Sequence, residues 1–195
     1  MTTPPVRLAL IVGGEREQST SSTIARWFAQ EVRTRPEFEL DVLYLSDFPL
    51  PTSGPSWQPG QAVRDVLATS VPRLTEAEAF VVVTPEYNRS FPAALKNFID
   101  WHLSEWRAKP VGFVLHGGGI GAGLRAVEQL RMVFEDLRSG TVREWVTFHG
   151  GATAVEGDRP RDDADAKLAV TALLDELAWW SLALRHGRAA LAYPA

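Results

Sequence analysis

The sequence contains no cysteine, and this absence excludes several kinds of chemistry. A chain without thiols forms no disulfide, offers no thiolate nucleophile and binds no iron–sulfur cluster or cysteine-ligated metal. Its histidine and carboxylate residues also lack the spacing of metal ligands, so no metal site is expected. Any redox chemistry must therefore come from a bound cofactor.

Long apolar runs and an excess of one charge are also missing. The apolar run at residues 8–12 is too short to cross a bilayer, and no basic segment followed by an apolar one begins the chain. The net charge is −4 and the 20 basic residues form no run. We therefore expect a cytoplasmic protein with no membrane and no nucleic-acid partner. The 195 residues, 45% of them hydrophobic, suit one α/β domain over residues 1–195.

Short apolar segments alternate with amphipathic segments along the chain. The predicted strands are residues 6–12, 38–44, 79–84, 111–115 and 141–148. Strict alternation with helices predicts a doubly wound parallel sheet in a three-layer α/β/α arrangement. Right-handed crossovers favour the strand order 2-1-3-4-5. In that order the loops after strands 1, 3 and 4 open on the same edge of the sheet, where such folds bind ligands.

Local signals also predict three helix ends. Ser21 or Ser22 is the expected N-cap of the first helix. The second helix is expected to break near Pro72. The last helix is predicted over residues 163–186, with Gly187 as its stop.

The loops after strands 1 and 4 have compositions that suit a ligand. The first, over residues 13–23, offers hydroxyls, an arginine and a helix start, which suit a phosphate; the alternative is a solvated loop with a serine cap. The second, over residues 116–123, has glycines that let backbone approach a flat ligand. Its formal match to a dinucleotide fingerprint is weak, because Asp136 lies in a predicted helix. No nucleophile elbow accompanies it, so an esterase is excluded.

The loop after strand 3 carries Pro85-Glu86-Tyr87-Asn88. A turn stiffened by proline can present backbone amides and a tyrosine face to an aromatic ring. The alternative is a plain strand-to-helix turn whose asparagine or serine caps the next helix.

The segment from Thr84 to Trp101 resembles the signature of the NADPH-dependent FMN reductase family. It reads TPEYN, followed by Ser90, Pro92, LKN at residues 95–97 and Asp100-Trp101. Residues 24–27, 109–112 and 124–131 also resemble the family, so the likeness covers most of the chain. The resemblance implies a flavodoxin-like fold with bound FMN.

Carried over position by position, the resemblance implies three groups of FMN-binding residues. The group expected at the phosphate is Gly14, Arg16, Gln18, Ser19 and Ser21. The group expected along the isoalloxazine ring and ribityl chain is Pro85, Glu86, Tyr87 and Asn88. The group expected at the pyrimidine end is Gly117, Gly118 and Gly119.

The resemblance also implies an activity. NAD(P)H passes a hydride to FMN, and a small-molecule acceptor such as a quinone, an azo compound or a flavin then takes the electrons in a ping-pong scheme. No side chain is expected to act as a catalytic acid or base. His116 is a candidate for that role or for substrate contact, although a structural role is favoured.

The sequence departs from the family pattern in the predicted site. Gly14 stands where a serine or threonine is usual, and Ser19 stands where an arginine is usual, which removes a hydroxyl and a charge from the phosphate site. Leu115-His116 replaces a common Ser-Tyr, and the loop around Ile120 is one residue longer. Two alternatives therefore stay open: a flavodoxin-type electron carrier, and a degenerate member that binds no flavin and acts as a sensor or interaction module. The modest net charge argues against the carrier.

The family resemblance implies a homodimer or a dimer of dimers, with FMN near the interface. Trp101, Trp106, Trp145 and the long loop over residues 45–60 either contact a partner subunit or belong to the core.

Overall fold

The computed structural model describes residues 3–14, 19–161 and 163–194. Five parallel strands form the sheet, in the order β2-β1-β3-β4-β5. They are β1 (Val6–Val12), β2 (Phe38–Tyr44), β3 (Ala79–Pro85), β4 (Pro110–Gly117) and β5 (Gly140–His149). The predicted fold class and strand order are confirmed. A small antiparallel pair, β6 (Val155–Glu156) and β7 (Arg159–Pro160), lies outside this sheet.

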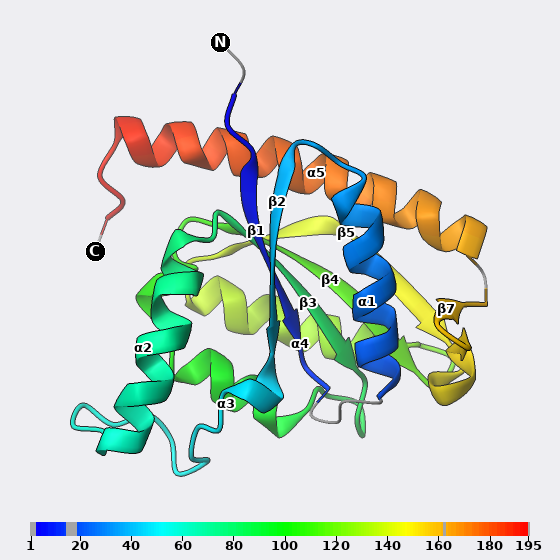
Figure 1. Ribbon diagram of the computed structural model, residues 1–195, viewed down its shortest axis with the longest axis horizontal. Coiled ribbons are helices and arrows are strands. Elements are labelled where there is room, and N and C mark those ends of the chain that lie inside the picture. The colour runs from blue at the N-terminus through cyan, green and yellow to red at the C-terminus, as the bar shows by residue number, and fades with distance from the viewer. Residues whose placement is uncertain (1–2, 15–18, 162, 195) are drawn as a thin grey trace.

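Helices cover both faces of the sheet (Figure 1). One face packs against α1 (Thr20–Arg33) and α5 (Asp163–Ala190). The other packs against α2 (Gln61–Glu76), α3 (Ala93–Asp100) and α4 (Leu124–Asp136). Every residue of β3 and β4 is buried, which explains why these central strands read as continuous apolar runs.

Glycine at position 112 lets α5 approach the sheet closely. A Cβ atom there would lie 2.7 Å from Cδ1 of Leu173 and 3.1 Å from Cδ1 of Leu177. Both leucines are fully buried, so a larger residue in β4 would push the helix away from the sheet.

The prediction that α2 breaks near Pro72 is wrong, because the helix continues to Glu76. Proline has no N–H, so Pro72 cannot donate the usual helical hydrogen bond to the carbonyl of Ala68. Both residues are exposed. The freed carbonyl therefore faces water, and Leu74 keeps the helix packed on the core.

The prediction that the last helix stops at Gly187 is also wrong, because α5 continues to Ala190. Two arginines tie this end of α5 to the body of the protein. Arg188 donates a hydrogen bond to the backbone oxygen of Ala108, and Arg185 binds Glu78. These tertiary contacts thus keep the segment helical although it contains a glycine.

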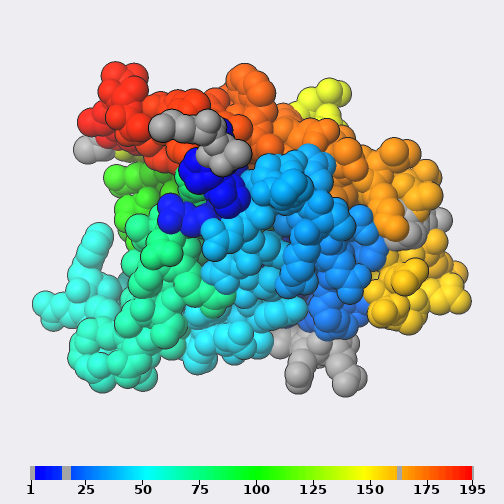
Figure 2. Space-filling view, turned by 45° about the horizontal axis from the view of Figure 1, so that its top comes forward, coloured from blue at the N-terminus to red at the C-terminus, as the bar shows by residue number. Residues whose placement is uncertain are grey.

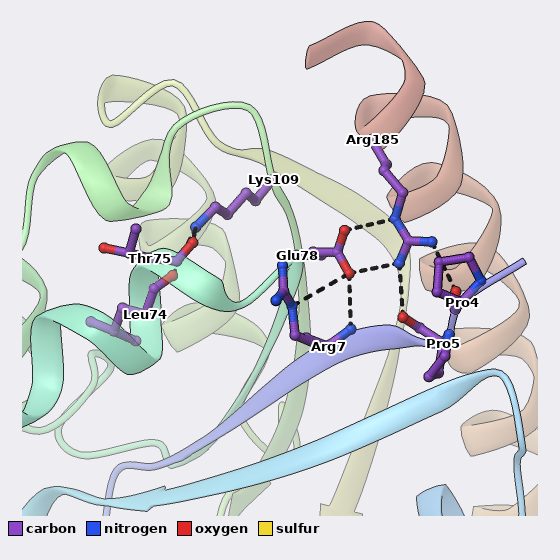
Figure 3. Close-up of polar contacts among 8 residues, drawn as sticks. All are labelled: Pro4, Pro5, Arg7, Leu74, Thr75, Glu78, Lys109 and Arg185. Atoms are coloured by element: carbon purple, nitrogen blue, oxygen red, sulfur yellow. Dashed lines mark hydrogen bonds and ion pairs between the residues drawn. The ribbon is translucent and has the colours of Figure 1, made fainter. Parts of the chain in front are cut away.

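The contacts of Arg185 join α5 to the amino-terminal ends of β1 and β3 (Figure 3). Its Nε and Nη2 atoms donate to the two carboxylate oxygens of Glu78 at 2.6 Å each. Its Nη1 and Nη2 atoms also donate to the carbonyls of Pro4 and Pro5, both at 2.9 Å. Glu78 accepts a further bond from the backbone N–H of Arg7. Burial opposes ionisation of Glu78, but these donors and their charges together lower the pKa of its carboxyl.

We expect the substitution Arg185→Leu to lower the free energy of unfolding by about 2 kcal/mol at pH 7, because it removes the nearer of the two arginines paired with Glu78. Glu78 has a depressed pKa in the folded state, so its contribution is present above its ordinary value of 4.5 and is lost as the pH falls through the folded-state pKa. Urea unfolding at pH 7 and at lower pH therefore gives a difference that shrinks in acid. Arg33→Leu, at an exposed position, is the control. A difference independent of pH would contradict the pairing.

Lys109 forms a second polar contact at the same end of the sheet (Figure 3). Its Nζ atom donates to the carbonyls of Leu74 and Thr75 in the last turn of α2, at 2.7 and 2.9 Å. Burial lowers the pKa of Lys109 to about 8. The amine therefore caps carbonyls that have no partner within the helix.

Three tryptophans, for which the sequence allowed either a core or an interface position, differ in exposure. Trp106 is fully buried and Trp101 is nearly so, with its indole N–H donating to the carbonyl of Pro51. Trp145 is 37% exposed on the edge strand β5.

The segment before α2, coloured cyan, projects from the body of the molecule (Figure 2). No helix in the described ranges has the length and apolar character that spanning a membrane requires.

Candidate functional site

A cleft of about 370 Å³ lies at the carboxyl ends of the strands. Its walls come from the loops that follow four strands of the sheet. The lining residues are Ser19, Thr20, Ser21, Pro85, Glu86, Tyr87, His116, Gly117, Gly118, Gly151 and Ala152. The loops after β1, β3 and β4 therefore meet, as parallel strands in this order require.

The start of α1 forms one end of the cleft. The N-cap is Ser19, and the predicted caps at Ser21 or Ser22 are wrong: the Ser19 hydroxyl accepts a hydrogen bond from the backbone N–H of Ser22 at 3.1 Å. The backbone N–H groups of Thr20 and Ser21, the two residues directly after the cap, have no hydrogen-bond partner in the described ranges. Free N–H groups and the helix dipole suit an anion at this point.

Gly14 packs tightly against this helix start. A Cβ atom at position 14 would lie 2.7 Å from both the Ser19 Oγ and the Ser21 Cβ. The helix start therefore occupies the space that a serine or threonine at position 14 would need. Gly14 itself does not line the cleft. The predicted phosphate ligands Arg16 and Gln18 lie outside the described residues.

His116 connects the end of β4 to the start of α1. Its Nε2 atom lies 2.7 Å from the Oγ of Ser21, and both residues are buried. Burial lowers the pKa of His116 to about 4, so the imidazole is neutral near pH 7. His116 also lines the cleft, where a neutral ring can exchange one hydrogen bond with a ligand. The sequence placed these two residues in separate loops, and their pairing across 95 positions comes only from the fold.

The turn after β3 has a defined shape. Tyr87 and Ser90 exchange two backbone hydrogen bonds, at 2.8 and 2.9 Å. Between them Asn88 and Arg89 have φ angles of 50° and 69°, as in a type I′ turn. Tyr87, which is 52% exposed, lines the cleft, but Asn88 does not. The turn thus uses asparagine for its backbone conformation, which asparagine adopts more readily than most residues.

Two residues of α4 hold this turn in place. Gln129 accepts a hydrogen bond from the Ser90 hydroxyl at 2.7 Å and donates to the carbonyl of Arg89 at 2.6 Å. One turn earlier, Arg125 contacts the Glu86 carboxylate through its backbone N–H and its guanidinium, at 3.3 and 3.4 Å. The sequence pattern alone does not mark these two positions as parts of the site. Their spacing of four residues on one helix face is the signal that could have suggested a joint contact.

The glycine loop after β4 contributes backbone to the cleft. Gly117 and Gly118 line it, whereas Gly119 does not. Gly151, in the short helix η3 (Gly151–Ala154), packs against Gly118: a Cβ atom at 151 would lie 3.3 Å from the Gly118 nitrogen. Gly151 and the adjacent Ala152 were missed because their segment reads only as a polar loop.

The cleft therefore offers free N–H groups, hydroxyls, glycine backbone and one exposed tyrosine ring. Its carboxylate, Glu86, is bound to Arg125, and its imidazole is neutral. Within the described ranges no three acidic or histidine side chains are grouped as a metal site. This set suits a phosphate joined to a flat aromatic ring, held mainly by backbone.

Comparison with known proteins gives a consistent assignment. The family model for NADPH-dependent FMN reductase matches residues 6–153. An NAD(P)H-dependent FMN reductase of Schizosaccharomyces pombe is 32% identical over 119 residues, which span 57% of this chain and 58% of that protein. A quinone reductase of Pseudomonas putida is 27% identical over 180 residues, 89% of this chain and 93% of that protein.

The structural comparison agrees in fold. The flavoenzyme FerB of Paracoccus denitrificans, described as an NAD(P)H:(acceptor) oxidoreductase, superposes with a TM-score of 0.70 at 22% identity, over 91% of this chain and 98% of that one. Because the family model covers all five strands of the parallel sheet and every loop of the cleft, the chain belongs to the NADPH-dependent FMN reductase family.

Proposed function

We propose that this chain is an FMN-dependent oxidoreductase that takes electrons from NAD(P)H and passes them to a small-molecule acceptor. The observation that carries the proposal is the cleft itself, in which the start of α1, the Tyr87 turn and the glycine loop converge. Relatives named as quinone reductases support a quinone among the acceptors.

The residues present fit FMN in two respects. The free N–H groups of Thr20 and Ser21 would hold the phosphate, with the helix dipole favouring its charge. Tyr87 and the backbone at Gly117 and Gly118 would flank the ring, where glycine lets a flat group approach closely. When bound, FMN supplies the hydride chemistry, receiving two electrons from NAD(P)H and passing them to the acceptor.

The role of the chain's own residues is to hold and position the flavin. Glu86 is held by Arg125, and His116 is neutral, so we assign neither a role as catalytic acid or base. The Ser19 hydroxyl serves as the helix cap, so among the described residues we assign the phosphate contact to the backbone N–H groups at the start of α1. A ping-pong order, in which nucleotide and acceptor use the flavin in turn, is part of this proposal.

The absorption spectrum of purified protein, as isolated and after addition of FMN, tests the proposal. We expect bound flavin bands that bleach within seconds when NADPH or NADH is mixed in without oxygen. Bound flavin that does not bleach would favour an electron carrier. Absence of any FMN binding would favour the degenerate member that acts as a sensor or interaction module.

We also propose that residues 1–195 act as one cytoplasmic domain and assemble as a homodimer or a dimer of dimers. Exposed aromatic side chains on β5 and α5 support an interface: Trp145, Trp179 and Trp180 are 37%, 63% and 42% exposed. Light scattering after size-exclusion chromatography measures the assembly, and a monomer would contradict it.

The substitution Gln129→Leu tests how the turn beside the flavin is held. It removes both hydrogen bonds to the turn, so we expect the free energy of unfolding to fall by about 1–2 kcal/mol and FMN to bind more weakly. Urea unfolding and an FMN titration measure the two effects. Gln129→Glu keeps the acceptor for Ser90 and loses the donor to Arg89. Its unfolding free energy and its FMN affinity should therefore lie between those of the leucine variant and the parent. Unchanged FMN affinity in the leucine variant would show that the turn is positioned by other contacts.

A further inference from the structure

Two buried pairs of a serine and a histidine occur in the described part of the chain. In one, the Oγ of Ser21 lies 2.7 Å from the Nε2 of His116. In the other, the Oγ of Ser70 lies 2.8 Å from the Nε2 of His102. All four residues are buried, but only Ser21 and His116 line the cleft. Both pairs make the same contact at Nε2, so they differ in what surrounds the other ring nitrogen, Nδ1.

The protein backbone sets the tautomer of His102. Its Nδ1 atom lies 2.7 Å from the carbonyl oxygen of Phe98, and a carbonyl only accepts hydrogen bonds, so Nδ1 carries the proton. Burial lowers the pKa of His102, which keeps the ring neutral near pH 7 with a single N–H. Its Nε2 atom is therefore an acceptor for the Ser70 hydroxyl. That hydroxyl also lies 3.3 Å from the carbonyl of Val66, but its single proton goes to the shorter contact, with Nε2.

No backbone group sets the tautomer of His116 in this way. In the described ranges its ring has one hydrogen-bond partner, the Ser21 hydroxyl. Burial lowers the pKa of His116 to about 4, so the ring is neutral near pH 7 and carries one proton on either nitrogen. With the proton on Nδ1, the Ser21 hydroxyl donates to the ring, as Ser70 does to His102. With the proton on Nε2, the ring donates to Ser21, and the hydroxyl keeps its own proton for a ligand.

The Ser21 hydroxyl belongs to the end of the cleft that we assign to the FMN phosphate. The backbone N–H of the same residue is one of the free donors at the start of α1. A Cβ atom at position 14 would lie 2.9 Å from the Ser21 Oγ, so this hydroxyl lies where a side chain at Gly14 would begin. The first turn of α1 has no acidic residue, and the carboxylate of Glu86 is bound to Arg125. A hydroxyl donor at this point therefore suits a phosphate oxygen as its acceptor.

We propose that His116 is a positioning residue for the FMN phosphate: its Nε2–H donates to Ser21 and so directs the Ser21 hydroxyl proton to the phosphate. The proposal rests on the function proposed above, because FMN supplies the phosphate. A phosphate oxygen accepts hydrogen bonds, so it selects this tautomer of His116 over the one that His102 has. The pair adds a side-chain donor to the backbone N–H groups and so replaces the hydroxyl that the family pattern has at position 14.

Nitrogen NMR of the histidine rings tests the tautomer directly. Long-range ¹H–¹⁵N spectra separate protonated from unprotonated ring nitrogens. The signals of His116 are those absent from His116→Gln or, should that variant not fold, those that change in Ser21→Ala. At pH 7 with saturating FMN, we expect the proton of His116 on Nε2 and that of His102 on Nδ1 in the same spectrum. A His116 proton on Nδ1 would overturn the proposal, because the Ser21 hydroxyl would then donate to the ring.

Inorganic phosphate is a second probe, which makes the result independent of the flavin. The full chain without FMN, saturated with inorganic phosphate, should show the same tautomer of His116. If the protein binds phosphate but no FMN, the proposed function fails, and the tautomer in the phosphate complex still supports or overturns this inference. Protein that binds neither FMN nor phosphate would overturn both.

The affinities for two flavins test what the Ser21 hydroxyl does. Ser21→Ala loses the hydroxyl but keeps the backbone N–H, so we expect FMN to bind about tenfold more weakly. Riboflavin, which lacks the phosphate, should bind this variant and the parent alike. Ser70→Ala is the matched control, since it removes the hydroxyl of the other pair and should bind both flavins normally. Unchanged FMN affinity in Ser21→Ala, an equal loss for riboflavin, or an equal loss in Ser70→Ala would overturn the proposal.

Discussion

Replacing Gly123 with alanine is expected to lower the free energy of unfolding by about 3 kcal/mol or more, the largest stability effect that we predict. Two costs combine at this position. Gly123 has a φ angle of 106°, in the region that favours glycine, as the chain enters α4. An added Cβ would also lie 2.5 Å from the Cβ of Leu115, a fully buried residue of β4 that has no room to move.

The same substitution at Gly119 is the matched control. Both glycines belong to the loop after β4, but no atom lies within 4 Å of a Cβ built at position 119. Gly119→Ala should therefore change stability by no more than about 0.5 kcal/mol. Urea denaturation followed by circular dichroism gives both values. Similar stability in the two variants would show that the contact between Gly123 and Leu115 does not fix the loop.

Replacing Thr20 with proline is expected to weaken FMN binding about 10- to 100-fold, because it removes one backbone N–H from the proposed phosphate site. The helix itself should tolerate the change. Thr20 is the first residue of α1, where proline is favoured. Ser19 before it has φ −94° and ψ 159°, the extended conformation that a residue preceding proline adopts. Stability without FMN should therefore stay within about 0.5 kcal/mol.

Two controls separate the N–H group from other effects of this change. Thr20→Ala removes the side chain but keeps the N–H, so its FMN affinity should remain close to that of the parent. Riboflavin has the ring system without the phosphate, so it should bind the proline variant and the parent alike. Fluorescence titration with both flavins measures these affinities. An equal loss of riboflavin binding would contradict the placement of the phosphate at the start of α1.

Much of the fold follows from local patterns. The strand at residues 6–12 was predicted at its observed bounds, because a strand buried on both faces is apolar over nearly its whole length. β4 is longer than the predicted residues 111–115, since ladder pairing with β5 extends it to Gly117. The two helix ends assigned from Pro72 and Gly187 were wrong, because packing and ion pairs outweighed the local preference of one residue.

The sequence by itself determined the strand order and the set of loops that meet at one edge, since alternation and handedness allow few topologies. Only the tertiary structure decided which side chains meet there. It paired Ser21 with His116, made Ser19 a helix cap and placed Gln129 against the Tyr87 turn. It also left Asn88 outside the lining of the cleft. Propensity and periodicity act over a few neighbouring residues, whereas these contacts join segments that only the folded sheet brings together.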